Sequence, residues 1–142
     1  MKNVLLLPLL LIGVAPVFGQ CDKTVALSTS KTEYLDASNT VERSVDEKSS
    51  IEMNGSEVII IPGGKTDHKM VGKIQSNACA WSVPYKDGKS VVKALFQDPS
   101  GNQQNATLTL EGKEGKLTFL MEVAEMPGRK IRVSVDEFAE KK

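Results

Sequence analysis

The chain has 142 residues, and its 18 lysines and arginines balance its 18 aspartates and glutamates, so the formal net charge is zero. This length fits one domain, and 40% hydrophobic with 25% charged residues is typical of a globular protein. A neutral chain lacks the basic surface of a nucleic-acid binder, so we expect no nucleic-acid partner. One histidine and two cysteines are too few for a multi-histidine or four-cysteine metal site, and we expect no metal and no cofactor.

Residues 1–19 are typical of a secretory signal peptide. Lys2 precedes an uncharged run from Val4 to Val14, and Pro16 ends that run shortly before Gly19. The run is shorter than the roughly 20 residues of a membrane-spanning helix, and no later segment is as apolar. We therefore expect cleavage after Gly19, a secreted or periplasmic protein without a membrane span, and a single domain over residues 20–142.

Export gives Cys21 two interpretations. In an oxidising compartment Cys21 and Cys79 are expected to form a disulfide that ties the N-terminus to the body of the domain. Alternatively, a signal sequence that ends close to a cysteine resembles that of a bacterial lipoprotein, which predicts a lipid anchor at Cys21. The lipoprotein pattern has a small residue directly before its cysteine. Gln20 is not small, so the disulfide is favoured.

Beyond Cys21, turn signals separate short runs that are rich in Val, Ile, Thr and Leu and that alternate as half-buried strands do. About nine or ten strands are predicted, over residues 24–35, 40–46, 49–53, 56–61, 68–76, 79–83, 90–97, 103–111, 116–125 and 130–136. Asn54-Gly55 predicts a hairpin with a type I′ turn, and Asp98 to Gly101 fits a type I turn. The best helix candidate is the tail, residues 136–142, which is too short to be stable alone.

Short connections between nearly all neighbouring strands predict an all-β fold, an antiparallel meander. Eight or more strands in a meander remove their open edges by closing into a barrel. An immunoglobulin-like β-sandwich is the alternative, and two positions disfavour it. Trp81 follows Cys79 instead of preceding it, and Asn77 stands where the corner tyrosine of that fold is expected.

The order of the strands, the hairpins at Asn54-Gly55 and at Asp98 to Gly101, and the glycine-rich strand ends resemble small secreted bacterial lipocalin-like (calycin-type) barrels. The resemblance covers residues 24–136 and is one of architecture. It implies a small barrel whose interior holds side chains or one small ligand.

Several strands carry more apolar residues than one buried face needs, which suggests that some of these residues line a ligand cavity. The candidate lining residues on the strands are Ile59, Ile61, Val92, Phe96, Phe119 and Met121. Trp81 and Tyr85, close to Cys79, have two interpretations. They either close the floor of the barrel or bind a ligand at a cavity mouth.

Catalysis is not expected, because no nucleophile with a neighbouring base and no facing pair of carboxylates can be named. The sequence favours an exported non-enzymatic domain that binds a small apolar ligand inside a β-barrel. The alternative is a protein-partner module, such as a periplasmic inhibitor or an envelope accessory protein. Its working surface would be the segment from Gln20 to Lys23 or the loop from Gly63 to His68.

Overall fold

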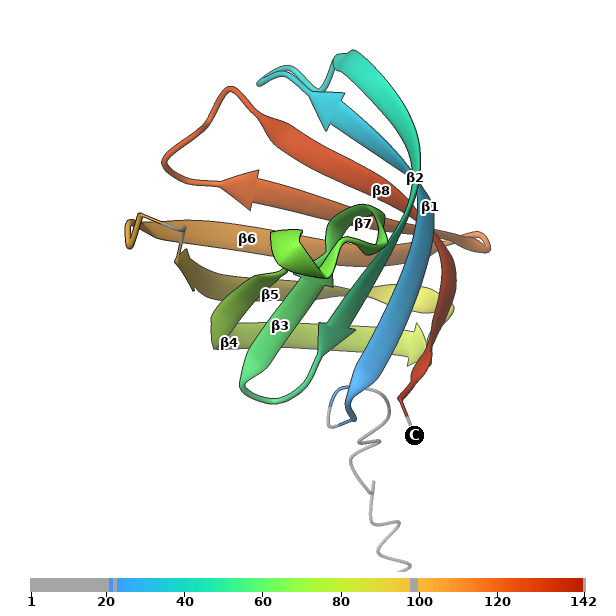
Figure 1. The fold of residues 1–142 in the computed structure, drawn as a ribbon. Helices are drawn as coiled ribbons and strands as arrows, with labels where there is room; N and C mark the ends of the chain where they lie inside the picture. The colour runs from blue at the N-terminus through green and yellow to red at the C-terminus, as the bar shows by residue number, and fades with distance from the viewer. Residues whose placement is uncertain (1–20, 22, 98–99, 142) are drawn as a thin grey trace, which may run out of the picture.

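The structure, a computed structural model, describes residues 21, 23–97 and 100–141, so the expected signal peptide lies outside the described residues. Eight strands follow one another along the chain and close into one antiparallel barrel, which confirms the predicted fold class (Figure 1). The architecture fits that of lipocalin-like barrels. The strands are β1 (Val25–Leu35), β2 (Val41–Met53), β3 (Glu57–Ile61), β4 (Met70–Val83), β5 (Asp87–Gln97), β6 (Gln103–Lys113), β7 (Lys116–Val123) and β8 (Lys130–Glu140). Two 3₁₀ turns, η2 (Pro62–Gly64) and η3 (Thr66–His68), connect β3 to β4.

Pairing of β8 with β1 closes the barrel, from Leu35 opposite Lys130 to Val25 opposite Glu140. Because the first and last strands of the meander are joined, the β-sandwich alternative is wrong. The helix predicted over residues 136–142 is also wrong, since β8 continues to Glu140 and places Phe138 opposite Leu27. As a strand, the tail gives the backbone of β1 the hydrogen-bond partners that an open edge lacks.

Two pairs of predicted strands are each one continuous strand. Residues 40–46 and 49–53 form β2, and residues 68–76 and 79–83 form β4. An irregularity in strand register lies close to each predicted break, opposite Thr29 to Lys31 in β2 and between Ile74 and Ser76 in β4. A β-bulge absorbs an extra residue and bends the strand without ending it, so an interrupted alternation did not mark a strand end.

The hairpin at Asn54-Gly55 is present, but its turn is not type I′. Neither Asn54 nor Gly55 has the positive φ angle that a type I′ turn requires. Instead, the Asn54 side-chain oxygen accepts the N–H groups of Ser56 and Glu57, both at 2.7 Å. The asparagine side chain thus stabilises the turn in the way an Asx turn does.

The inward side chains of all eight strands form the core. On β3 these are Val58 and Ile60, while Ile59 and Ile61 lie outside the core cluster, so the prediction that the latter two line the interior is wrong. The register of β3 on β2, with Val58 opposite the buried Met53, sets this choice. A shift of one residue would turn the other two isoleucines inward. Val92, also predicted to line a ligand cavity, is buried in the core.

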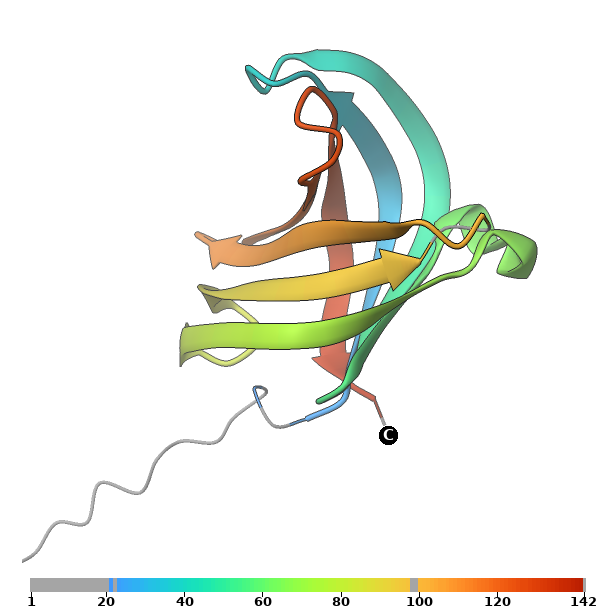
Figure 2. The same cartoon turned by 90° about the vertical axis from the view of Figure 1, so that its left-hand side faces the viewer.

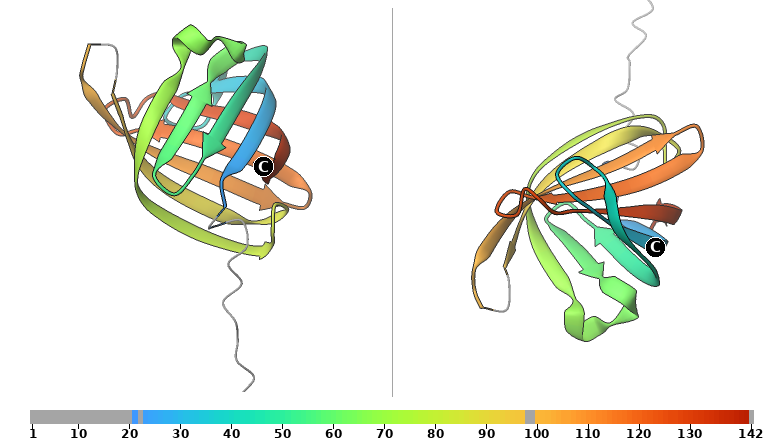
Figure 3. Two further views of the ribbon diagram at one scale, coloured as in Figure 1. Left: turned by 60° about the horizontal axis from the view of Figure 1, so that its bottom comes forward. Right: turned by 90° about the horizontal axis from the view of Figure 1, so that it is seen from above.

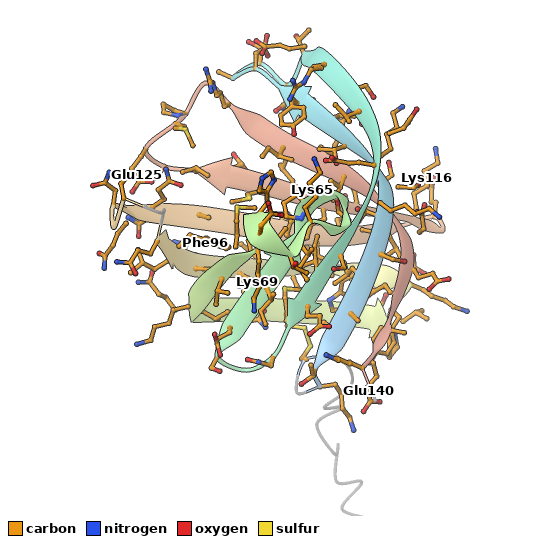
Figure 4. All side chains as sticks on the ribbon, viewed as in Figure 1. Lys65, Lys69, Phe96, Lys116, Glu125 and Glu140 are labelled. Carbon is orange, nitrogen blue, oxygen red and sulfur yellow. A yellow bond between two sulfur atoms is a disulfide. The ribbon has the colours of Figure 1, made fainter. Side chains whose placement is uncertain are left out.

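The barrel has two unlike ends. The connections 36–40, 62–69 and 124–129 form the mouth end, and the connections 54–56, 84–86 and 114–115 form the floor end. Lys116 and Glu125, at the two ends of the β7 segment, mark the floor and the mouth in Figure 4. Strands β4, β5 and β6 lie across the direction of β1, β2 and β8 (Figure 2). The η2–η3 segment stands at the mouth end, away from the C-terminus (Figure 3).

A disulfide joins Cys21 to Cys79, with 6.0 Å between the Cα atoms, as predicted. The Sγ atom that a lipid anchor would occupy is therefore bonded to Cys79, which favours the disulfide over lipidation. No helix among the described residues is long and apolar enough to span a membrane. The disulfide itself is typical of extracellular and periplasmic proteins.

Candidate functional site: a cavity at the mouth of the barrel

A cavity of about 150 Å³ lies inside the barrel at the mouth end. Most of its wall is apolar, and the apolar lining residues are Ile51, Ile60, Pro62, Met70, Phe119, Met121, Ile131 and Val133. The polar lining residues are Thr29, Thr32, Tyr34, Glu47 and Ser49. The cavity thus offers a hydrophobic chamber with a polar side formed by β1 and β2.

Strand register builds the wall in two rows. Val133 of β8 lies between Thr32 of β1 and Phe119 of β7, and this gives the first row. One step nearer the mouth, Ile131 lies between Tyr34 and Met121 in the second. Side chains of directly paired residues project from the same face of a sheet, so the two rows form a continuous wall.

The opposite wall depends on the shortness of β3. This strand has 5 residues, against 13 in β2 and 14 in β4, so it does not cover the upper half of β2. The η2–η3 segment lies there instead and places Pro62 against the cavity. The Gly63 N–H donates to Ser49 Oγ at 3.0 Å and holds η2 on β2. Gly63 has a φ of 61°, which glycine adopts readily.

The Thr29 hydroxyl in the deep wall is satisfied within the protein. Thr29 is 2% exposed, and its hydroxyl donates to the Ser49 carbonyl at 3.4 Å. Among the described residues, no buried side-chain nitrogen or oxygen lacks a hydrogen-bond partner. An apolar group can therefore lie against Thr29 without depriving that buried hydroxyl of its hydrogen bond.

Charge enters the lining at one position, Glu47 of β2. Glu47 and Lys48 together lie opposite the single residue Ser30 of β1. Two residues opposite one define a β-bulge. The carboxylate lies beneath η2, since a Cβ atom built on Gly63 would be 3.3 Å from Glu47 Oε2. Farther along β2, the Arg43 guanidinium lies 4.2 Å from the centroid of the Tyr34 ring.

The predicted ligand residues divide between this cavity and other places. Phe119 and Met121 line the cavity. Phe96 is a buried core residue whose ring lies against Gly72, and Figure 4 labels it. Trp81 and Tyr85 lie at the floor end, near the disulfide formed by Cys79.

Aromatic rings close the floor. The Phe138 ring centroid lies 5.6 Å from that of Trp81 and 4.9 Å from that of Tyr85. The Trp81 indole N–H donates to Ser90 Oγ at 2.8 Å, and this hydroxyl donates to Cys79 Sγ at 3.3 Å. Burial, with a smaller contribution from the Glu140 carboxylate, raises the pKa of Tyr85. The hollow left beside the disulfide is about 30 Å³, room for about one water molecule.

A larger hollow of about 470 Å³ lies on the outside, over β4 and β5. Exposed side chains line much of it, among them Val71, Lys73 and Gln97. Since an open groove leaves a ligand in contact with water, the smaller interior cavity is the better candidate site for an apolar molecule.

Sequence reasoning missed most of the lining, including Ile60, Ile131 and Val133. The alternation of Ile131 with Arg132 and of Val133 with Ser134 did mark their face as buried. Which buried positions face the cavity depends on the length of β3 and on the position of η2. The alternation of residues predicts neither of these two features.

Other chemistry is limited in the described part of the chain. It holds no cluster of three His, Cys, Asp or Glu side chains that could bind a metal ion. His68 is exposed on η3 beside Asp67, with 3.7 Å between the imidazole and the carboxylate. Comparisons of the chain with protein-family models, curated proteins and solved structures find no match.

Proposed function

We propose that this chain is an exported, non-enzymatic, lipocalin-like domain that binds a small apolar molecule in the cavity at the mouth of the barrel. The observation that carries the proposal is the chamber itself, about 150 Å³ with a mainly hydrophobic wall. Burial of apolar surface stabilises a complex by about 25 cal/mol per Å². The apolar run before Gly19 and the Cys21–Cys79 disulfide support export.

The size of the cavity limits the ligand. Pockets for drug-sized molecules usually measure about 300–1,000 Å³, and a dry cavity of about 150 Å³ accommodates a molecule the size of benzene. We therefore expect an apolar group of about six to ten non-hydrogen atoms. At an intermediate value of about 0.7 kcal/mol per atom, the binding free energy is about 4–7 kcal/mol, which corresponds to a dissociation constant between about 10 μM and about 1 mM.

Toluene is a suitable first probe, and the shift of the thermal unfolding midpoint with toluene concentration reports binding. We expect toluene to stabilise the natural protein. Val133→Phe should remove this effect, because the larger ring grows into the cavity. Val71→Phe makes the same change on the outer groove, where Val71 is 40% exposed, and should leave the effect intact. Stabilisation that survives Val133→Phe but is lost with Val71→Phe would move the site to the groove.

A protein-partner role is the second candidate, and the floor half of β4 favours it. From Gln75 to Val83 this strand carries no charged side chain, and among the described residues strand pairing is recorded only with β5. Native edge strands usually carry charges that discourage pairing with other chains. An extended segment of another protein could add to this edge. A photo-crosslinking residue at Ser82 should then capture one defined protein in the native host, while the same residue at Ser134 on the paired β8 should not.

A further inference from the structure

A single carboxylate belongs to the lining of the apolar cavity. Glu47 is half-buried, and no hydrogen bond or ion pair among the described residues engages its side chain. Two other carboxylates near this end are paired with cations of the protein. Glu33 pairs with Arg132 at 3.2 Å, and Glu122 pairs with Lys130 at 3.7 Å. Glu47 is thus a negative charge held at the cavity without a cation from the protein.

The local fold holds Glu47 in this place. The bulge in β2 lies directly beside Ser49, which accepts the Gly63 N–H and fixes η2 above the carboxylate. Lys65 and Lys69 of the same connection are exposed and do not belong to the lining (Figure 4). Bulges often aim side chains into functional sites. The carboxylate is therefore presented to whatever occupies the mouth of the cavity.

A half-buried carboxylate next to an apolar chamber favours one ligand chemistry. It repels an anionic ligand, gains little from a hydrocarbon, and attracts a cationic donor, since charge-assisted hydrogen bonds are stronger than neutral ones. Arg43, farther along β2, lies over the Tyr34 ring, and among the described residues no ion pair joins it to Glu47.

We propose that the ligand is a small amphipathic amine, whose apolar part fills the chamber and whose ammonium group binds the Glu47 carboxylate. This inference rests on the proposed function and specifies its ligand class. A ring or short alkyl group of about six to eight atoms fits the cavity volume, and a one- or two-carbon link then reaches the mouth. Glu47 is the specificity-determining residue of this site.

Three probes with the same ring and link test the proposal: 2-phenylethylamine, 2-phenylethanol and 3-phenylpropanoate. Dissociation constants are measured by calorimetry at pH 7, where an alkylamine is protonated. We expect the amine to bind the natural protein about five- to tenfold more tightly than the alcohol, and the carboxylate to bind most weakly. Because exposed charges are screened by salt, added sodium chloride should reduce the preference for the amine.

Glu47→Gln should lower affinity for the amine by the same five- to tenfold and leave affinity for the alcohol unchanged. Asp46→Asn is the matched control, because it removes the neighbouring charge on the exposed face of β2. It should change neither affinity by more than about twofold.

The outcomes separate the two proposals. An alcohol that binds as tightly as the amine, or an amine preference that survives Glu47→Gln, overturns the role of Glu47 and leaves the apolar cavity as a site. If neither the amine nor the alcohol binds, the proposed function fails together with this inference.

Discussion

Gly72 shows how a single residue shapes the interior of the barrel. A Cβ atom at this position would lie 2.7 Å from Cζ of the Phe96 ring, which is closer than side-chain carbons approach one another. Phe96 is 5% exposed and has little room to retreat. The absence of a side chain on β4 therefore creates the place that the ring on β5 fills.

Gly72→Ala should destabilise the fold by about 1–3 kcal/mol, the usual cost of overpacking a core. Combined with Phe96→Leu, the same change should cost clearly less, because the smaller side chain leaves space for the added methyl group. Urea unfolding of the two single variants and the double variant gives the coupling energy. Additive effects would show that Gly72 and Phe96 are not in contact.

A second residue-scale feature is the link between Asn105 and Glu125 at the mouth end. The Asn105 side-chain amide and its backbone N–H both donate to the Glu125 carboxylate, at 2.9–3.0 Å. These hydrogen bonds, the side-chain one foremost, lower the pKa of Glu125 from its usual value of 4.5. The folded protein then binds the Glu125 proton less tightly than the unfolded chain does. The ionised carboxylate therefore stabilises the fold above pH 4.5, and this stabilisation is lost as the pH falls through the lowered pKa of the folded state.

Glu125→Gln should therefore lower the melting temperature at pH 7, and the difference from the natural protein should shrink as the pH falls below 4.5. Glu42→Gln, at an exposed position on β2, serves as the control and should show little change at either pH. A Glu125→Gln deficit that is the same at pH 3 and pH 7 would contradict this linkage.

At the scale of single residues, alternation in the sequence identified the buried face of most strands. It placed Phe119 and Met121 on one face of β7, and both line the cavity. It did not decide between Val58 with Ile60 and Ile59 with Ile61, because all four are apolar and only the pairing with β2 distinguishes them. Glu47 carries no sequence signal, since its place in the lining depends on a bulge.

Among the elements, β8 and the N-terminal segment together make the floor. Phe138, near the end of β8, contacts Trp81 and Tyr85, and Cys21 is bonded to Cys79 beside them. The disulfide could be predicted from two cysteines and the expected export of the chain. The strand conformation of residues 136–140 could not, because the segment lacks the alternation of apolar residues, and its partner β1 lies at the other end of the chain.

Loss of the disulfide should destabilise the fold without changing the cavity. The bond closes a span of 58 residues, for which the chain-entropy model gives about 4 kcal/mol. A Cys21→Ser/Cys79→Ser variant should thus unfold at a lower urea concentration, with a free energy of unfolding reduced by up to that amount. A reductant should lower the stability of the natural protein and leave that of the variant unchanged. Toluene should still stabilise the variant, because the cavity lies at the opposite end. Loss of toluene binding in a folded variant would place the ligand at the floor.

At the scale of the whole molecule, closure into a barrel follows from the sequence, while the cavity does not. Short turns between consecutive strands predict the meander, and a meander of this length gains by joining β1 to β8. The inward side chains leave about 30 Å³ beside the disulfide in the floor half, against about 150 Å³ where β3 ends early and η2 takes its place. The unequal strand lengths thus give the barrel a more filled half and a more hollow half.

The methionine methyl groups allow the location of bound toluene to be measured directly. Met70 and Met121 line the cavity, Met53 is buried in the floor half, and Met126 is 38% exposed outside. Trp81 is a poor reporter by comparison, because it lies at the floor. With ¹³C-labelled methionine methyl groups, the nuclear Overhauser effect from toluene protons identifies which methyl groups contact the ligand.

We expect contacts from toluene to the methyl groups of Met70 and Met121, and none to those of Met53 or Met126. The chemical shifts of the Met70 and Met121 methyl groups should saturate as the toluene concentration rises. Contacts to Met53 or Met126 instead, or shifts that grow linearly without saturation at every methionine, would contradict an apolar binding site at the mouth of the barrel.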